Sequence, residues 1–112
     1  MVWILLAEIA AAQELAPPAR MTGPVNTLFT VNDYPKKAVR YGWEGAVAAD
    51  ITVGPEGRVS DCRIAQSSGY QLLDDTTCRI IVTRARFIPA RDKDGKAVSD
   101  RLRTPPVIWK LR

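Results

Sequence analysis

Histidine is absent from this sequence, and cysteine occurs only twice. The lack of histidine excludes Ser–His and Cys–His catalytic pairs, and it removes the commonest metal ligand. The two cysteines do not form a Cys-x-x-Cys pair, so no zinc site of the usual kind is expected. Neither a Gly-x-Gly-x-x-Gly nor a Gly-x-x-x-x-Gly-Lys segment is present to hold phosphates. An enzyme is therefore the least expected kind of protein, and no cofactor is expected.

The 112 residues suit one domain with a modest core, and their formal charge of +4 is unevenly placed. Residues 79–112 carry ten Lys and Arg against three Asp, whereas residues 1–78 carry six basic and nine acidic residues. A basic end suits nucleic acid, anionic lipid or an acidic partner. Its basic residues are scattered among apolar ones without the interleaved aromatics of single-strand binders, which favours a solvated surface. Nucleic-acid binding stays as one alternative.

The first 12 residues are apolar apart from Glu8. They are too few to span a membrane, which takes about 20 apolar residues. Their length and the small residues before Gln13 are typical of a secretory signal, although no basic residue precedes them. We predict a signal peptide over 1–12, with a buried helix as the alternative. A short proline-containing linker is then expected over 13–25, and a folded domain over 26–112.

The folded part is expected to begin with a short strand around 28–31. A helix should follow over 35–41, because Pro35 suits the first turn of a helix and Asp33 is placed to cap it. Gly42 is expected to end this helix.

A β-hairpin is predicted next. Its first strand shows a two-residue alternation of apolar side chains, and the segment 54–57 (Gly-Pro-Glu-Gly) predicts a tight reversal. The second strand covers about 58–66, where Val59 breaks the alternation and indicates a bulge. The inward side chains of the first strand are Val47, Ala49, Ile51 and Val53.

The adjacent serines Ser67 and Ser68 invite comparison with a nucleophile, but no histidine is present to act as the base. Ser68 and Gln71 have the spacing of a capping box, and acidic residues in the first turns suit the positive end of a helix. We therefore interpret the serines as a helix start. The buried face of that helix is predicted from helical spacing to comprise Leu73, Thr77, Cys78, Ile81 and Ala85.

The chain closes with a turn at Asp94-Gly95 and a final strand in which Val107, Trp109 and Leu111 share one face. Pro105 and Pro106 cannot donate ladder hydrogen bonds, so this strand is expected at a sheet edge. The predicted fold class is α+β, with an antiparallel three- to four-stranded sheet and two helices packed on one face.

Over about residues 33–111, the sequence resembles the C-terminal domain of TonB-family energy transducers. The resemblance rests on a series of short motifs, none of which is specific by itself, although their order along the chain is specific. The motifs are Tyr34-Pro35, Ala38, Gly45-x-Val47, Gly57-Arg58-Val59, Ser67-Ser68-Gly69, Leu73-Asp74, Arg86-Phe87-x-Pro89-Ala90 and Val107-x-Trp109-x-Leu111.

The resemblance implies a periplasmic domain that binds outer-membrane transporters by pairing an edge strand with their TonB box. Such proteins pass force from an inner-membrane motor complex, so that iron chelates (siderophores) or vitamin B12 are imported. A full transducer also carries a membrane anchor and a long proline-rich linker, which this sequence does not match. The alternative is a secreted, non-transducing module of the same fold that binds another cell-envelope partner.

Two sets of site residues follow from the expected fold. Cys62 and Cys78 lie on elements that pack together, so we expect a disulfide, with two reduced thiols as the alternative. The partner-binding edge strand is expected at Val107, Ile108, Trp109, Lys110 and Leu111, with a basic rim of Arg101, Arg103, Lys110 and Arg112 that attracts an acidic flank. The alternative is an edge already covered, either by residues 27–31 or by a second copy in a homodimer.

Overall fold

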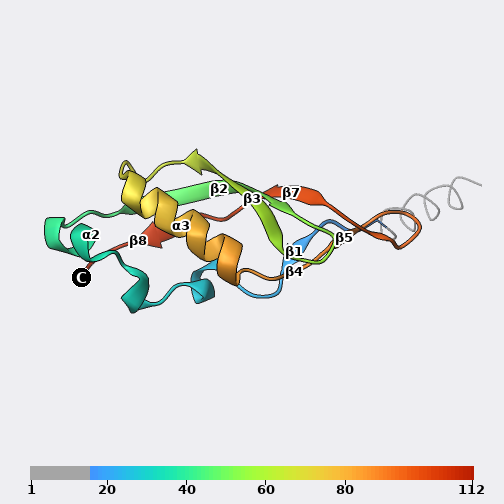
Figure 1. The fold of residues 1–112 in the computed structure, drawn as a ribbon, viewed down its shortest axis with the longest axis horizontal. Helices are drawn as coiled ribbons and strands as arrows, with labels where there is room; N and C mark the ends of the chain where they lie inside the picture. Colours follow the sequence, from blue (N-terminus) through green and yellow to red (C-terminus); the bar gives the residue numbers. More distant parts are fainter. Residues whose placement is uncertain (1–15) are drawn as a thin grey trace, which may run out of the picture.

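A computed structural model describes residues 16–112 and shows a four-stranded antiparallel sheet covered on one face by helices (Figure 1). The long strand β2 (Gly45–Val53) lies at its centre and pairs with β3 (Val59–Gln66) on one side. On its other side β2 pairs with two strands in succession, β7 (Asp100–Arg103) and β8 (Val107–Trp109).

Two helices accompany the sheet, as the sequence predicted. Helix α3 (Gln71–Arg84) lies across its inner face, and the short α2 (Lys36–Tyr41) lies near one end (Figure 1). The smaller elements are the 3₁₀ turns η1 (Val25–Leu28) and η2 (Val31–Asp33), the strand pair β1 (Arg20–Met21) and β4 (Phe87–Ile88), and the pair β5 (Ala90–Arg91) and β6 (Ala97–Val98). The predicted α+β class is confirmed. Within residues 16–112, no helix has the length and apolar character needed to cross a bilayer.

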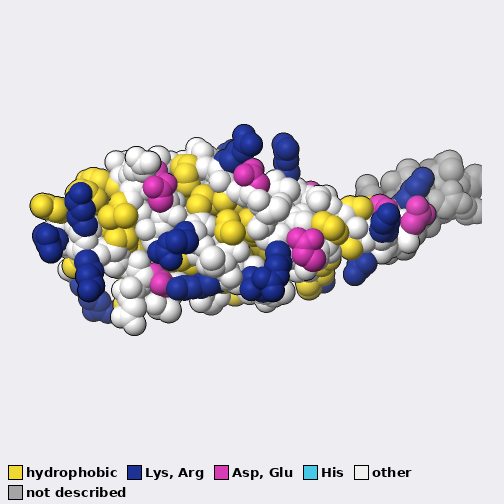
Figure 2. All heavy atoms as spheres, in the orientation of Figure 1, with side chains coloured by type: hydrophobic (Ala, Val, Ile, Leu, Met, Phe, Trp, Pro, Cys, Tyr) yellow, Lys and Arg dark blue, Asp and Glu magenta, His cyan; other side chains and the backbone are white. Residues whose placement is uncertain are grey.

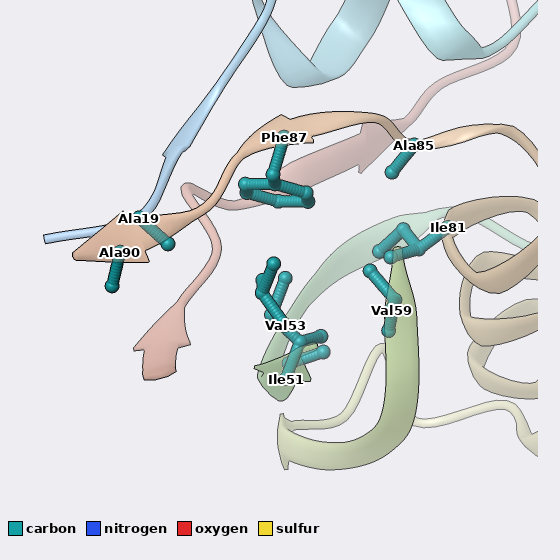
Figure 3. Packing of buried hydrophobic residues seen from close by; sticks show 9 residues of the cluster. Ala19, Ile51, Val53, Val59, Ile81, Ala85, Phe87 and Ala90 are labelled. Atoms are coloured by element: carbon teal, nitrogen blue, oxygen red, sulfur yellow. The ribbon is translucent and has the colours of Figure 1, made fainter. Parts of the chain in front are cut away.

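The core consists of two groups of buried side chains that share the inner face of the sheet. One group lies between β2, β3 and the end of α3, and includes Ile51, Val53, Val59, Ile81 and Phe87 (Figure 3). The other lies toward α2 and β8, and its buried members are Val25, Ala38, Val47, Leu73, Ile80, Val107 and Trp109. Each large aliphatic side chain so buried contributes about 1.5–3 kcal/mol to folding.

The predicted hairpin and its bulge are both present. The register passes from Thr52 opposite Asp61 to Val53 opposite Val59, which leaves Ser60 as the extra residue. The turn also touches β4, because the Phe87 N–H donates to the Gly57 carbonyl at 2.8 Å. Gly57 has φ 83°, and a Cβ there would overlap the Phe87 carbonyl oxygen, so the position requires glycine.

The strand expected over 28–31 is wrong, because Leu28 ends η1, Val31 begins η2, and the two residues between them pair with no strand among residues 16–112. The cause is local. The Asp33 carboxylate accepts hydrogen bonds from the Thr30 N–H at 2.7 Å and the Thr30 hydroxyl at 3.0 Å, which bends the chain into a turn. Asp33 therefore does not cap α2, whose N-cap is Pro35. Gly42, with φ 69°, ends α2 as predicted.

The capping box expected between Ser68 and Gln71 is also wrong, since Asp74 takes that role. Its carboxylate accepts from the Ser67 hydroxyl at 2.5 Å, the Ser68 hydroxyl at 2.8 Å and the Ser68 N–H at 2.9 Å. Burial raises the pKa of Asp74, but these hydrogen bonds outweigh it and hold the pKa below its usual value. The serines still serve the helix start, because both are bound to Asp74 in the first turn of α3.

Part of the segment expected to be a linker is attached to the domain. The Arg91 N–H donates to the Pro17 carbonyl at 3.1 Å, and the Ala19 N–H donates to the Asp100 carboxylate at 2.9 Å. Strand β1 then pairs with β4. The expected signal peptide lies outside the described residues.

Candidate partner-binding edge

Strand β8 begins after a break in the sheet edge that Thr104 and two prolines produce. The Thr104 N–H donates to the Ala49 carbonyl at 2.8 Å, and the Ala49 N–H donates to the Thr104 hydroxyl at 3.1 Å. The threonine hydroxyl thus supplies the acceptor for the Ala49 N–H at this break, and Pro105 and Pro106, which follow, have no N–H to donate to the ladder. The register shifts by one residue, and β8 resumes pairing with β2 at Val107 opposite Val47.

Trp109 fixes the inner face of β8 to α3. Its side chain is 5% exposed, and its indole N–H donates to the Thr77 hydroxyl at 2.8 Å. Phe29 and Tyr34 pack edge-on against the indole, with ring centroids at 5.6 and 5.1 Å. The strand is therefore anchored by its side chains, and its outer backbone is not needed for attachment.

The outer backbone of β8 is open, since within residues 16–112 only β2 pairs with this strand. The Leu111 N–H donates to the Glu44 carboxylate at 2.6 Å, and Glu44 immediately precedes β2. Because N–H groups alternate between the two sides of an extended strand, those of Ile108 and Lys110 face the open edge. The Ile108 side chain is 65% exposed on the outer face. This edge offers free donors beside an exposed apolar residue.

A groove of about 650 Å³ follows the open edge of β8. Its opposite wall is the segment of residues 24–34, which holds η1 and η2 and is called the strap below. Lys110 is the only charged residue among the groove's lining residues in the described part of the chain. The lining comprises Pro24, Val25, Asn26, Phe29, Thr30, Val31 and Tyr34 from the strap, and residues 105–110 from the edge.

Arg84, at the end of α3, holds the strap in place. Its guanidinium donates to both oxygens of the Asp33 carboxylate, at 2.6 and 2.8 Å, and to the Leu28 carbonyl at 2.9 Å. The hydrogen bond from Arg84, aided by the Thr30 N–H, holds the pKa of Asp33 far below its usual range. Further along the strap, the Tyr34 hydroxyl donates to the Trp43 carbonyl.

The residues predicted for the edge lie together, while those predicted for the basic rim do not form one group. Val107, Ile108 and Trp109 make up β8, and Lys110 and Leu111 follow directly. Arg101 and Arg103 lie on β7, beyond the break, and Arg103 is paired with Asp50 at 2.7 and 3.0 Å. Arg112 is exposed near the end of β8. Lys110 alone lines the groove.

The two cysteines are joined, as expected. A disulfide links Cys62 on β3 to Cys78 on α3, with 5.8 Å between the Cα atoms. It ties the sheet edge opposite β8 to the helix. It does not touch the groove.

The strap is the part of the site that sequence reasoning missed. Phe29 and Tyr34 contact Trp109, yet the apolar run 28–31 by itself predicts a strand. The available signal was the spacing of Thr30 and Asp33, which matches a capping box.

Other kinds of site find less support. Residues 16–112 contain no group of three His, Cys, Asp or Glu placed to hold a metal ion. Figure 2 shows Lys and Arg spread over the face that carries α3, separated by uncharged and apolar side chains. This distribution differs from the continuous stripe of a nucleic-acid binder.

Comparison with known proteins points to one family. The sequence model of the protein family described as "Gram-negative bacterial TonB protein C-terminal" matches residues 30–111. Protein tonB2 of Pseudomonas aeruginosa is 35% identical over 79 residues, which cover 70% of this chain and 28% of that protein. The chain therefore spans little more than a quarter of that relative's length.

A solved structure agrees with this result. The solution NMR structure of the Pseudomonas aeruginosa TonB CTD matches with a TM-score of 0.58 and 25% sequence identity, covering 89% of this chain and 90% of that one. The family match covers most of the domain, including β2, β3, α3 and β8, and the solved structure reproduces the arrangement. The chain therefore belongs to the family of Gram-negative bacterial TonB protein C-terminal domains.

Proposed function

We propose that this domain binds an extended segment of an outer-membrane transporter, its TonB box, by β-strand addition to the open edge of β8. The observation that carries the proposal is this edge itself. Its backbone faces no other strand within residues 16–112, while Trp109 and Val107 hold its inner face to the core. Main-chain hydrogen bonds to a partner segment would supply the affinity.

The groove beside the edge supports the same proposal. In an added strand, alternate side chains project toward the strap, where Phe29, Val31 and Tyr34 offer apolar contact. The intervening side chains project to the outer face beside Ile108. Lys110 at the groove favours a partner that carries an acidic residue close to the paired segment.

The setting that we propose is the periplasm, with a role in energy-coupled import of iron chelates or vitamin B12. Members of the TonB family are energy transducers, and transduction needs a connection to an inner-membrane motor complex. A chain without such a connection would use the same edge as a non-transducing binding module for another cell-envelope partner. The binding step is common to both and is tested first.

Replacing Ile108 by proline tests the edge directly. The change removes one outward N–H and leaves the hydrogen bonds between β8 and β2 in place. Ile108→Ala is the matched control, because it removes the side chain but keeps the donor. We expect Ile108→Pro to weaken binding of a synthetic TonB-box peptide roughly tenfold or more in calorimetry, as loss of a main-chain hydrogen bond and poorer strand docking imply. Ile108→Ala should lose less binding affinity for the peptide than Ile108→Pro.

Circular dichroism and urea unfolding show whether each variant remains folded. A folded Ile108→Pro variant that binds the peptide as tightly as the parent would rule out strand addition at this edge.

A further inference from the structure

Building on the proposed function, we propose that Arg84 is a positioning residue for partner binding: it clamps the strap through Asp33 and Leu28 and thereby keeps the groove formed before the peptide arrives. Arg84 does not line the groove. Its contacts are to Leu28 and Asp33, which do not line the groove either.

The strap has few means of holding its own shape. It consists of two single 3₁₀ turns, and within the described residues it pairs with no strand. Of its own side chains Val25 is buried, whereas Leu28, Phe29 and Tyr34 are only partly buried against the core and Val31 is 90% exposed. Short 3₁₀ turns have poor hydrogen-bond geometry and little intrinsic stability. Contacts from elsewhere in the fold must therefore keep the strap in one position.

The Arg84 guanidinium provides such contacts at two points of the strap. It reaches the carbonyl of Leu28, where η1 ends, and the carboxylate of Asp33, where η2 ends. The same carboxylate accepts from the Thr30 N–H and hydroxyl, so one ion pair organises both turns. A planar guanidinium suits this bidentate arrangement, whereas a lysine ammonium does not reproduce it.

The clamp and the groove wall lie on adjacent residues. Thr30 and Val31 line the groove, and Asp33 and Leu28 flank them in sequence. A strap released from Arg84 would have to be ordered again when a peptide binds, and ordering each flexible side chain costs affinity. Loss of the clamp therefore weakens binding without removing a contact to the peptide.

Three variants test the proposal at neutral pH, with the synthetic TonB-box peptide as the probe. Arg84→Gln and Asp33→Asn each remove the ion pair, and Arg84→Lys keeps the positive charge but loses the bidentate contact of the guanidinium with the carboxylate. We expect each to weaken binding, roughly tenfold for Arg84→Gln, because several lining side chains lose their fixed positions. Arg79→Gln, on the same helix and without an ion-pair partner among residues 16–112, is the matched control and should bind as the parent does.

Two readouts separate positioning from a purely structural role. The Arg84 side chain is 42% exposed, so its loss should leave the urea midpoint almost unchanged. Amide hydrogen exchange should instead become faster at Thr30, whose N–H loses an ordered acceptor, while the β2 and β3 amides stay protected. An affinity loss that follows a matching loss of global stability would overturn the proposal.

A second experiment uses alanine variants of the peptide to test whether Arg84 acts through the strap. A peptide that has lost its groove-facing side chain should bind the parent and Arg84→Gln with nearly equal affinity, because it no longer uses the strap. If Arg84→Gln binds every peptide as the parent does, the clamp has no role and edge pairing still stands. If the parent binds no peptide, the proposed function itself is wrong.

Discussion

The hydrogen bond between Trp109 and Thr77 ties the inner face of β8 to α3. Both groups are buried, with Thr77 fully inaccessible to solvent, and the indole N–H lies 2.8 Å from the hydroxyl oxygen. Thr77→Val keeps the shape of the side chain but removes the acceptor, together with the O–H that donates to the Leu73 carbonyl at 2.7 Å. Because no cavity forms, the expected effect is the cost of burying an unpaired N–H, about 1–3 kcal/mol.

Urea unfolding measures this effect. With a slope of about 1–3 kcal/mol per molar urea for a small domain, a loss of this size lowers the midpoint by roughly 1 M while the slope stays the same. Thr83→Val is the matched control, because Thr83 lies on the same helix and bonds back to the Arg79 carbonyl at 2.8 Å but is exposed. Equal midpoints for the two variants would refute the reasoning that this bond stabilises the fold.

Three further predictions concern the rest of the fold. Reducing the disulfide should lower the free energy of unfolding by about 3 kcal/mol, which urea unfolding with and without reductant measures; two alkylated thiols in protein isolated from cells without reductant would contradict the bond. Gly57→Ala should lower the thermal midpoint, because the new Cβ overlaps a carbonyl and φ is positive, whereas Gly23→Ala, whose Cβ meets its nearest atom at 3.7 Å, should have little effect. The Arg84 hydrogen bond lowers the pKa of Asp33, so the pair contributes stability above the unfolded pKa of about 4, and this contribution is lost as the pH falls below it; it is small because the Arg84 side chain is 42% exposed. Asp33→Asn should therefore flatten the decline of unfolding free energy in acid only slightly, and a decline steeper than that of the parent would count against the pair.

The elements that the sequence revealed are those with a regular period and clear ends. The alternation along 47–53 and the reversal at 54–57 defined the hairpin, and the helical spacing from Leu73 to Ala85 defined α3. The edge position of β8 followed from Pro105 and Pro106. In each case local chemistry and the tertiary fold favour the same structure.

The strap could not be predicted in the same way. Its apolar run looks like a strand, but its conformation depends on Asp33 and on Arg84, which lies 51 residues further along the chain. The groove was missed for the same reason, since one of its walls is the strap. At the start of α3, Ser68 and Gln71 have the correct spacing, yet the charged carboxylate of Asp74 is the stronger acceptor and takes both serine hydroxyls.

The positions of residues 17–21 and of β8, toward opposite ends of the domain, determine how a pulling force would act on it. Residues 17–21 lie at the end of the domain that carries β5, and β8 lies toward the other end (Figure 1). A segment bound along β8 and pulled against the N-terminal side of the domain would load the β2–β8 pairs along the strand axis. The hydrogen bonds at the Gly45–Trp109 and Val47–Val107 pairs would then share the load in shear instead of opening one after another. The Trp109 indole, locked under α3, would resist the same displacement, so a three-residue strand can bear a pull that its length alone would not suggest.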